Sequence, residues 1–261
     1  MAIWHDLVAR GLQWVAGRPP ARRAGETLIA DTEAGELRVD LYRAPGAGAD
    51  VPVYLNFADT RFIARDAARD DGFCRALADA LGCVVLNVHV GAAPQARFPV
   101  APAQAQAAAW WAMMAGRKHG WAGKRLALGG TGAGANLALG ACLDLPARMG
   151  VKPLAVAALL PRLDMAAAPG GWRDRVAQAA YLPDRAARLA PLASPVRAET
   201  LDGFAPTLIA AGEGDPHRGE GEAFAAMLHA AGRQVHLAPV PGPEAAQAEA
   251  RAFLARIFAA G

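Results

Sequence analysis

The chain is poor in serine, lysine and cysteine, residue types on which many catalytic, nucleic-acid-binding and metal-binding sites depend. Its 261 residues include a single serine, Ser194, and only three lysines. The net charge is +3 and the arginines are scattered, so no basic stripe or aromatic platform predicts nucleic-acid binding. The three cysteines have no metal-ligand spacing, and their odd number is typical of core packing in a reducing compartment. We expect neither a metal nor a cofactor.

Long apolar runs are absent as well. No stretch of about 18 uninterrupted, strongly apolar residues occurs, so we expect no membrane span. Asp6 and Arg10 interrupt the first apolar run and no basic segment precedes it, which argues against a signal peptide. We therefore expect a cytoplasmic protein. An apolar content of 54% and this length suffice for a large globular core.

Strand and helix patterns alternate along most of the chain. Residues 4–16 have the spacing of an amphipathic helix, residues 18–25 form a linker, and residues 27–31 and 36–42 are expected to pair as a hairpin. The alternation from residue 51 onward predicts an α/β fold, a mostly parallel sheet with helices on both faces. Strands are expected at 51–57, 84–90, 125–128, 154–160, 207–211 and 234–240. Helices are expected at 66–81, 103–116, 134–145, 220–231 and 244–259.

One segment, residues 163–196, does not fit this alternation. An insertion at this place in such a sheet is typical of a cap over the ligand cleft, because the cleft lies at the carboxyl ends of the strands. We therefore divide the chain into an N-terminal helix and linker, residues 1–25, and an α/β domain, residues 26–261, that carries the cap.

The chain is organised around a glycine-rich corner. Residues 125–138 read Arg-Leu-Ala-Leu-Gly-Gly-Thr-Gly-Ala-Gly-Ala-Asn-Leu-Ala, with helix-forming composition from Ala133 onward. A strand, a sharp turn and a helix are the context of the nucleophile elbow, Gly-x-Ser-x-Gly. Gly130, Gly132 and Gly134 supply glycines for such a turn. The place of the serine, however, is taken by Gly132, which has no side chain.

From about Val51 to its end the chain resembles the hormone-sensitive-lipase family of α/β-hydrolases, in its bacterial carboxylesterase branch. The corner parallels the family's Gly-Asp-Ser-Ala-Gly-Gly-Asn-Leu-Ala. Further matches, in the family's order, are Ala93-Pro94, Phe98-Pro99, Ser194-Pro195, Ala205-Pro206-Thr207-Leu208, Gly212, Asp215-Pro216 and Gly221-Glu222-Ala223. The resemblance implies the α/β-hydrolase fold with a helical cap, and esterase machinery made of a nucleophile, a base, an acid and an oxyanion loop.

Most of that machinery is missing. The nucleophile position is Gly132 and the histidine position after the last strand is Ala245. The family's His-Gly-Gly-Gly oxyanion loop is replaced by Asn56, Phe57, Ala58 and Asp59. Bulk and a carboxylate in this loop oppose the stabilisation of an oxyanion by backbone N–H groups. Only the acid position, Asp215, is retained, and Asp-Pro is also typical of a helix N-cap with proline at the first helical position.

No other residue is an obvious replacement. His89 lies near the carboxyl end of its expected strand, where packing in the core or at an edge is favoured over facing the cleft. His217 follows Asp215 too closely for the usual acid–base pair. Thr131 adjoins the tip of the corner, but its side chain should point elsewhere. The hydroxyl of Ser194 is expected to serve a turn or cap.

We therefore expect a pseudo-hydrolase that uses its cleft for a small apolar or acyl ligand, or as a partner surface. The candidate ligand contacts are Asn56, Phe57, Ala58, Asp59, Thr131, Gly132, Ala133 and Trp172. One alternative is an ester hydrolase with an unorthodox site that depends on Asn56, Thr131, His89 or Asp215. Another is a scaffolding subunit, a homodimer included, with Trp110-Trp111 and the N-terminal helix as its interface, although core packing is favoured for the tryptophans.

Overall fold

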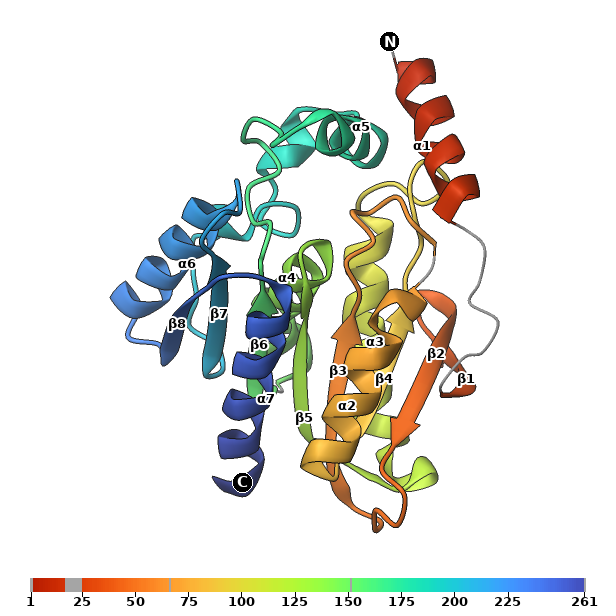
Figure 1. Cartoon of the computed structure of the whole chain (residues 1–261), viewed down its shortest axis with the longest axis vertical. Helices are drawn as coiled ribbons and strands as arrows, with labels where there is room; N and C mark the ends of the chain where they lie inside the picture. The colour runs from red at the N-terminus through yellow and green to blue at the C-terminus, as the bar shows by residue number, and fades with distance from the viewer. Residues whose placement is uncertain (1, 17–24, 66, 151, 261) are drawn as a thin grey trace.

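The computed structural model describes residues 2–16, 25–65, 67–150 and 152–260. An eight-stranded sheet runs through the molecule in the order β1-β2-β4-β3-β5-β6-β7-β8 (Figure 1). β2 pairs antiparallel with both β1 and β4, and the other neighbouring strands are parallel. The strands are β1 (Glu26–Thr32), β2 (Gly35–Arg43), β3 (Val51–Phe57), β4 (Val84–His89), β5 (Trp121–Thr131), β6 (Ala155–Leu159), β7 (Thr207–Gly212) and β8 (Val235–Val240).

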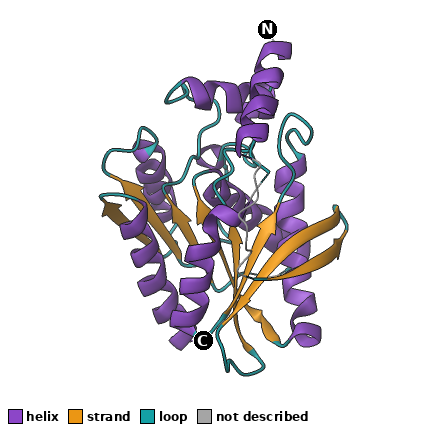
Figure 2. Cartoon of the chain, turned by 45° about the vertical axis from the view of Figure 1, so that its right-hand side comes forward, coloured by secondary structure: helices purple, strands orange, loops and turns teal. Residues whose placement is uncertain are grey.

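Helices cover both faces of this sheet (Figure 2). They are α1 (Ala2–Ala16), α2 (Asp71–Leu81), α3 (Val100–His119), α4 (Ala133–Met149), α5 (Trp172–Tyr181), α6 (Arg218–Ala230) and α7 (Pro243–Ala260). Short 3-10 turns are η1 (Ala67–Asp70), η2 (Ala186–Leu189) and η3 (Pro195–Arg197). The α/β-hydrolase architecture expected from the sequence is confirmed.

Two apolar clusters, one on each face, hold the layers together. The larger contains side chains of α3, α4 and α6, such as Leu137 and Phe224, and the smaller contains side chains of α2 and α7, such as Leu77 and Phe253. Every residue of β6 and β7 is buried. Burial on both faces explains why these strands are nearly continuous apolar runs instead of alternating ones.

Several predicted boundaries need correction. The strand expected at 125–128 extends over Trp121–Thr131, and the helix expected at 103–116 spans Val100–His119. The helix expected at 66–81 is the 3-10 turn η1 followed by α2. Residues 18–24 of the predicted linker lie outside the described part of the chain. Within that part, no helix is long and apolar enough to cross a membrane.

The predicted cap contains a helix that the sequence patterns did not delimit, α5. It lies beyond the carboxyl ends of the parallel strands and packs against α1 (Figure 1, top). Trp111, half of the tryptophan pair considered as an interface, has its ring centroid 5.9 Å from that of Trp121 and 6.0 Å from that of His119. Trp111 is thus partly buried against the larger apolar cluster, and Trp110 is partly buried as well, so neither reaches the full burial that core packing predicted.

Candidate functional site

The expected elbow is present between β5 and α4. β5 ends at Thr131 and α4 begins at Ala133, so Gly132 alone makes the corner. Its φ of +56° is in the left-handed region, where glycine is favoured because it has no Cβ. The N–H of Gly132 donates to the carbonyl of Leu159 at 2.9 Å, and its carbonyl accepts the N–H of Asn136 at 3.2 Å. The backbone of the elbow is therefore held on both sides.

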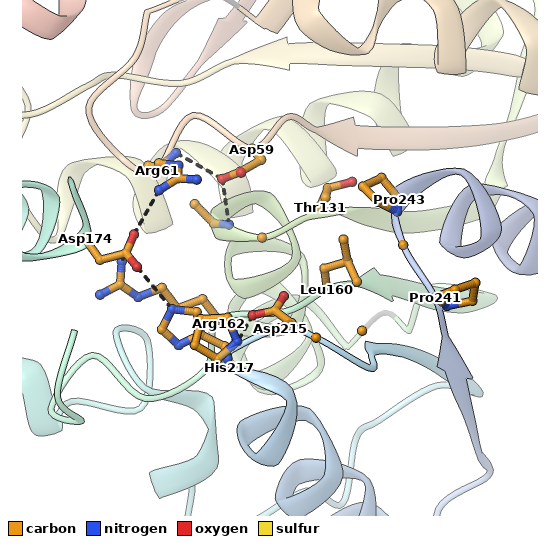
Figure 3. A pocket seen from close by; sticks show the side chains of 16 residues that line it. Asp59, Arg61, Thr131, Leu160, Arg162, Asp174, Asp215, His217, Pro241 and Pro243 are labelled. Carbon is orange, nitrogen blue, oxygen red and sulfur yellow. Dashed lines mark hydrogen bonds and ion pairs between the residues drawn. The ribbon is translucent and has the colours of Figure 1, made fainter. Parts of the chain in front are cut away.

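A carboxylate occupies the space above this elbow. A Cβ on Gly132 would lie 2.7 Å from Cγ of Asp59 and 2.8 Å from its Oδ1, closer than Cβ atoms approach such groups. Oδ1 of Asp59 also accepts the backbone N–H groups of Arg61, at 3.1 Å, and Ala133, at 3.3 Å (Figure 3). The N–H of the residue after the nucleophile is the one that a working elbow offers to the oxyanion. Here the Asp59 carboxylate takes both that donor and the nucleophile's space.

A pocket of about 470 Å³ opens above Gly132. Its lining comes from the segments after the parallel strands β3, β5, β6, β7 and β8, which end at the same edge of the sheet, and from the cap helix α5. The side chains with charged or hydroxyl groups are Asp59, Arg61, Thr131, Arg162, Asp174, Asp215 and His217. This volume and these convergent polar groups are typical of small-molecule sites.

Three cationic side chains meet at Asp174, which the cap helix α5 contributes (Figure 3). Oδ1 of Asp174 lies 3.1 Å from Nη1 of Arg61 and 3.6 Å from Nη1 of Arg162. Its Oδ2 lies 3.5 Å from Nε2 of His217. The other ring nitrogen of His217, Nδ1, is 2.7 Å from Oε1 of Glu220. That hydrogen bond raises the pKa of His217 above its ordinary value, which favours the charged imidazolium.

Arg162 is the most deeply placed of these cations. Only 7% of its side chain is exposed, and its Nε and Nη1 have no hydrogen-bond partner. Burial lowers the pKa of the guanidinium, which the charges of Asp174 and Glu220 oppose. A guanidinium remains protonated in proteins even so. The pocket therefore contains a buried positive charge with unused N–H donors.

The predicted ligand contacts divide into two groups. Asp59, Thr131, Gly132 and Ala133 line the pocket as expected, whereas Asn56, Phe57, Ala58 and Trp172 do not. Phe57 and Ala58 are buried in the packed interior, so neither faces the cleft. Trp172 is 58% exposed on α5, with the guanidinium of Arg173 over its ring. Asn56, Phe57, Ala58 and Trp172 therefore do not line this pocket, contrary to expectation, whereas ligand contact by Asp59, Thr131, Gly132 and Ala133 stays a prediction.

Asn56 does not line the pocket because its side chain forms hydrogen bonds with Asn87 and Asp70. Its amide nitrogen donates to Oδ1 of Asn87 at 2.9 Å and to Oδ2 of Asp70 at 3.0 Å. Burial raises the pKa of Asp70 to about 6 despite the hydrogen bond from Asn56. These side chains form a buried network that ties β3 to β4 and η1, so Asn56 is not available to bind a ligand.

The acid and base positions also differ from expectation in detail. Asp215 lines the pocket, and its Oδ1 accepts the N–H of His217 at 2.8 Å, the bond expected from a capping aspartate to the second residue after it. α6 begins at Arg218, two residues later than the predicted start at Pro216. Ala245 lies in the first turn of α7, partly buried against the apolar cluster of that face. The base position thus carries only a methyl group.

His89 and Ser194 are both engaged away from the pocket. Nε2 of His89 is 2.6 Å from Oδ2 of the buried Asp40, at the pairing of β4 with β2. Oγ of Ser194 donates to the carbonyl of Arg188 at 2.6 Å and accepts the N–H of Met165 at 2.8 Å. These contacts agree with the favoured expectations, which were packing at a strand for His89 and a turn hydroxyl for Ser194.

Four residues at the site were missed by sequence analysis: Arg61, Arg162, Asp174 and Glu220. Arg61 and Arg162 had a usable signal, since both follow expected parallel strands within a few residues, where ligand-binding side chains gather. His217 and Glu220, three residues apart at a helix start, also had the spacing of a side-chain pair. Asp174 had no signal, because its position depends on how the cap folds back.

Comparison with known proteins identifies the family to which this chain belongs. A model of the alpha/beta hydrolase fold matches residues 60–244, more than half of the chain. Carboxylic ester hydrolase LipN of Mycobacterium tuberculosis is 33% identical over 222 residues, which cover 78% of this chain and 59% of LipN. Esterase LipI of the same species is 33% identical over 230 residues, which cover 80% of this chain and 70% of LipI. The chain thus spans about three fifths of the length of LipN.

Solved structures of esterases have the same fold as this chain. An esterase of Pyrobaculum calidifontis superposes with a TM-score of 0.81 at 25% identity, covering 98% of this chain and 91% of that one. A thermostable esterase of Pseudomonas putida has the same fold, with a TM-score of 0.81 at 24% identity over 99% of this chain and 90% of that one. The chain belongs to the esterase- and lipase-like family of α/β-hydrolases.

Proposed function

We propose that this chain is a non-catalytic member of its family, a pseudo-hydrolase that binds a small molecule in the cleft above Gly132. The observation that carries the proposal is the position of Asp59. Its carboxylate lies 2.7 to 3.1 Å from the point where a side chain at Gly132 would begin. Ser-type ester hydrolysis needs an activated nucleophile at that point, and the space is filled by a side chain from the segment after β3.

The charge of Asp59 supports the same proposal. Hydrolysis of an ester develops negative charge on the carbonyl oxygen, which the elbow's N–H groups stabilise. Here the N–H of Ala133 already faces the Asp59 carboxylate at 3.3 Å. Two like charges about 4 Å apart repel by roughly 4 kcal/mol at an effective dielectric constant near 20. A repulsion of that size would slow the reaction by roughly a thousandfold, before the missing base is considered.

The base is the third element of the argument. The position that holds a histidine in the family is Ala245, and the pocket's own histidine, His217, is turned to other partners. Its Nδ1 pairs with Glu220 at 2.7 Å and its Nε2 faces Asp174 at 3.5 Å. An imidazole whose two nitrogens both face carboxylates has no free nitrogen to accept a proton from a nucleophile. What remains is an open pocket with convergent polar groups, which suits binding.

We also propose a reducing compartment, the cytoplasm. Cys74, Cys83 and Cys142 are all buried and free of disulfides. Buried free thiols in the core support this assignment, since oxidising compartments favour paired cysteines.

Ester turnover tests the proposed function. We expect purified protein to release p-nitrophenol from p-nitrophenyl acetate and butyrate no faster than the same protein after heat denaturation. Esterase LipI, assayed in parallel, is the positive control. Turnover by the native chain that saturates with substrate and is lost on heating would contradict the proposal.

A second candidate function, weak ester hydrolysis, is favoured by the position of Asp59 itself. A carboxylate oxygen in the nucleophile's place could attack the acyl carbon and expel the alcohol, which takes a proton from water. Water would then hydrolyse the resulting anhydride, releasing the acid and restoring the Asp59 carboxylate. This route predicts turnover that disappears in Asp59→Asn and persists in Asn56→Ala, whose side chain does not line the pocket. Equal turnover by both variants would indicate a contaminating esterase.

A further inference from the structure

Among the contacts that join the cap to the body of the protein, one carboxylate of α5 meets two arginines and a histidine. Asp174 is in the first turn of α5, while its partners Arg61, Arg162 and His217 follow β3, β6 and β7 in the chain. Figure 3 shows the Asp174 carboxylate between Arg61 on one side and the Arg162 and His217 side chains on the other. The cluster lines the same pocket as the elbow.

Asp174 makes only one short contact with the three side chains of this cluster. Its distance to Arg61, 3.1 Å, is that of a hydrogen bond. Its distances to Arg162, 3.6 Å, and His217, 3.5 Å, are long for one. Nε and Nη1 of Arg162 accordingly have no hydrogen-bond partner, although the side chain is only 7% exposed. Asp174 is tethered to a helix, so its carboxylate cannot approach all three cations closely at once.

The carboxylate of a free ligand can approach these side chains more closely than the carboxylate of Asp174 can. The guanidinium presents parallel N–H donors whose spacing matches the two oxygens of a carboxylate, and such bidentate pairs are among the strongest hydrogen bonds in proteins. Nε2 of His217 faces the same place, 3.5 Å from Oδ2 of Asp174, and the hydrogen bond of Nδ1 with Glu220 raises the pKa of the ring, which favours a donor at Nε2. Oε2 of Glu220 already accepts the N–H groups of Leu163 and Asp164, at 2.5 and 2.8 Å, which fixes Glu220 in place.

We propose that Arg61, Arg162 and His217 form a binding site for the carboxylate of a small organic acid, and that Asp174 of the cap fills this site until the ligand displaces it. The inference rests on the proposed function, because it names the ligand class of that same cleft. The cations of the body are the recognition element, and Asp174 is an internal competitor. Binding of the ligand therefore releases the Asp174 contacts, while Tyr181 at the other end of α5 remains stacked on Phe62.

The rest of the pocket narrows the ligand further. Leu160, Pro241 and Pro243 provide apolar surface for the body of the acid. Asp59 and Asp215 also line the pocket, and its described lining holds no cationic side chain beyond Arg61, Arg162 and His217 that could pair with a second carboxylate. The site thus selects a monocarboxylate with an apolar body over a dicarboxylate.

Calorimetric titration with hexanoate tests the inference, with hexanamide as the neutral analogue of the same shape. We expect saturable binding of hexanoate to the wild type and none of hexanamide. Asp174→Asn should bind hexanoate about tenfold more tightly, because the competing charge is gone from an otherwise unchanged side chain. Absence of hexanoate binding to the wild type at millimolar concentrations would overturn the inference, as would equal binding of hexanamide or an unchanged affinity in Asp174→Asn.

Two further variants test whether hexanoate binds at the cluster of Arg61, Arg162 and His217. Arg61→Gln, at a side chain that is 45% exposed, should fold and lose most of its affinity for hexanoate. Asp164→Asn is the matched control, since Asp164 pairs with Arg197 at 2.9 Å and does not line the pocket. It should bind hexanoate as the wild type does. Full affinity in Arg61→Gln would contradict the inference.

The outcomes separate this inference from the proposed function. Hexanoate binding together with true ester turnover would leave the carboxylate site in place and refute only the non-catalytic function. Absence of both would refute the carboxylate site alone, since a non-catalytic cleft is compatible with other ligands.

Discussion

Gly134→Ala is expected to lower the free energy of unfolding by about 3 kcal/mol or more. A Cβ on Gly134 would lie 1.7 Å from the carbonyl oxygen of Phe57 and 2.5 Å from its carbonyl carbon. Both are backbone atoms at the end of β3, so no side chain can rotate out of the way. Either α4 or the end of β3 must move, and overpacking of this kind is at the severe end of the usual range. Urea unfolding followed by circular dichroism measures the loss.

A second glycine provides the matched control. Gly72 is the second residue of α2, as Gly134 is of α4, but a Cβ on Gly72 would meet nothing within 4 Å. Gly72→Ala should therefore raise stability by about 0.5–1 kcal/mol, the usual gain from replacing glycine in a helix. Similar unfolding curves for the two variants would show that α4 and β3 are not packed backbone to backbone at the elbow.

Gly132→Ser is the substitution that restores the family's serine, and we expect it to destabilise the protein without producing esterase activity. The backbone conformation at φ +56° costs a non-glycine residue about 1–3 kcal/mol. The new Cβ would also lie 2.7 Å from Cγ of Asp59, which must leave its hydrogen bond with Ala133. Chemical unfolding measures the first effect, and hydrolysis of p-nitrophenyl butyrate measures the second.

A double-mutant cycle separates the two contributions to the loss of stability. In the background of Asp59→Ala, Gly132→Ser should cost less than in the wild type, because the steric conflict is gone and only the backbone strain remains. Turnover by Gly132→Ser alone would contradict our interpretation of the site. So would equal costs in both backgrounds, which would mean that Asp59 is not above the elbow.

Much of the fold was predictable from the sequence because local patterns determine it. Fully buried strands such as β6 and β7 are apolar runs bounded by turns, and the elbow is a run of glycines between a strand and a helix. Since parallel strands end at one edge of the sheet, residues after them could be expected near one another, as Asp59 and Thr131 are. The extent of β5 was underestimated because Gly123 and Lys124 are not typical strand residues.

The details of the site were not predictable, for a physical reason. Asn56, near the end of β3, and Asp59, just after β3, are three residues apart, yet the Asn56 side chain joins a buried network and the Asp59 side chain reaches over the elbow. Sequence gives the residue types but not the side on which each one emerges. The cluster around Asp174 depends in addition on the path of the cap. Sequence analysis predicted which parts of the catalytic machinery are missing, and the structure shows which side chains lie near those positions.

Reaction with a fluorophosphonate tests most directly whether the cleft holds an activated nucleophile. Such probes form a stable adduct with the nucleophile of a working serine hydrolase, which intact-mass spectrometry detects. We predict that the native protein keeps its unmodified mass while LipI, treated in parallel, gains one phosphonyl group. A single adduct on the native chain that maps to a residue lining the pocket, such as Thr131, would contradict the account.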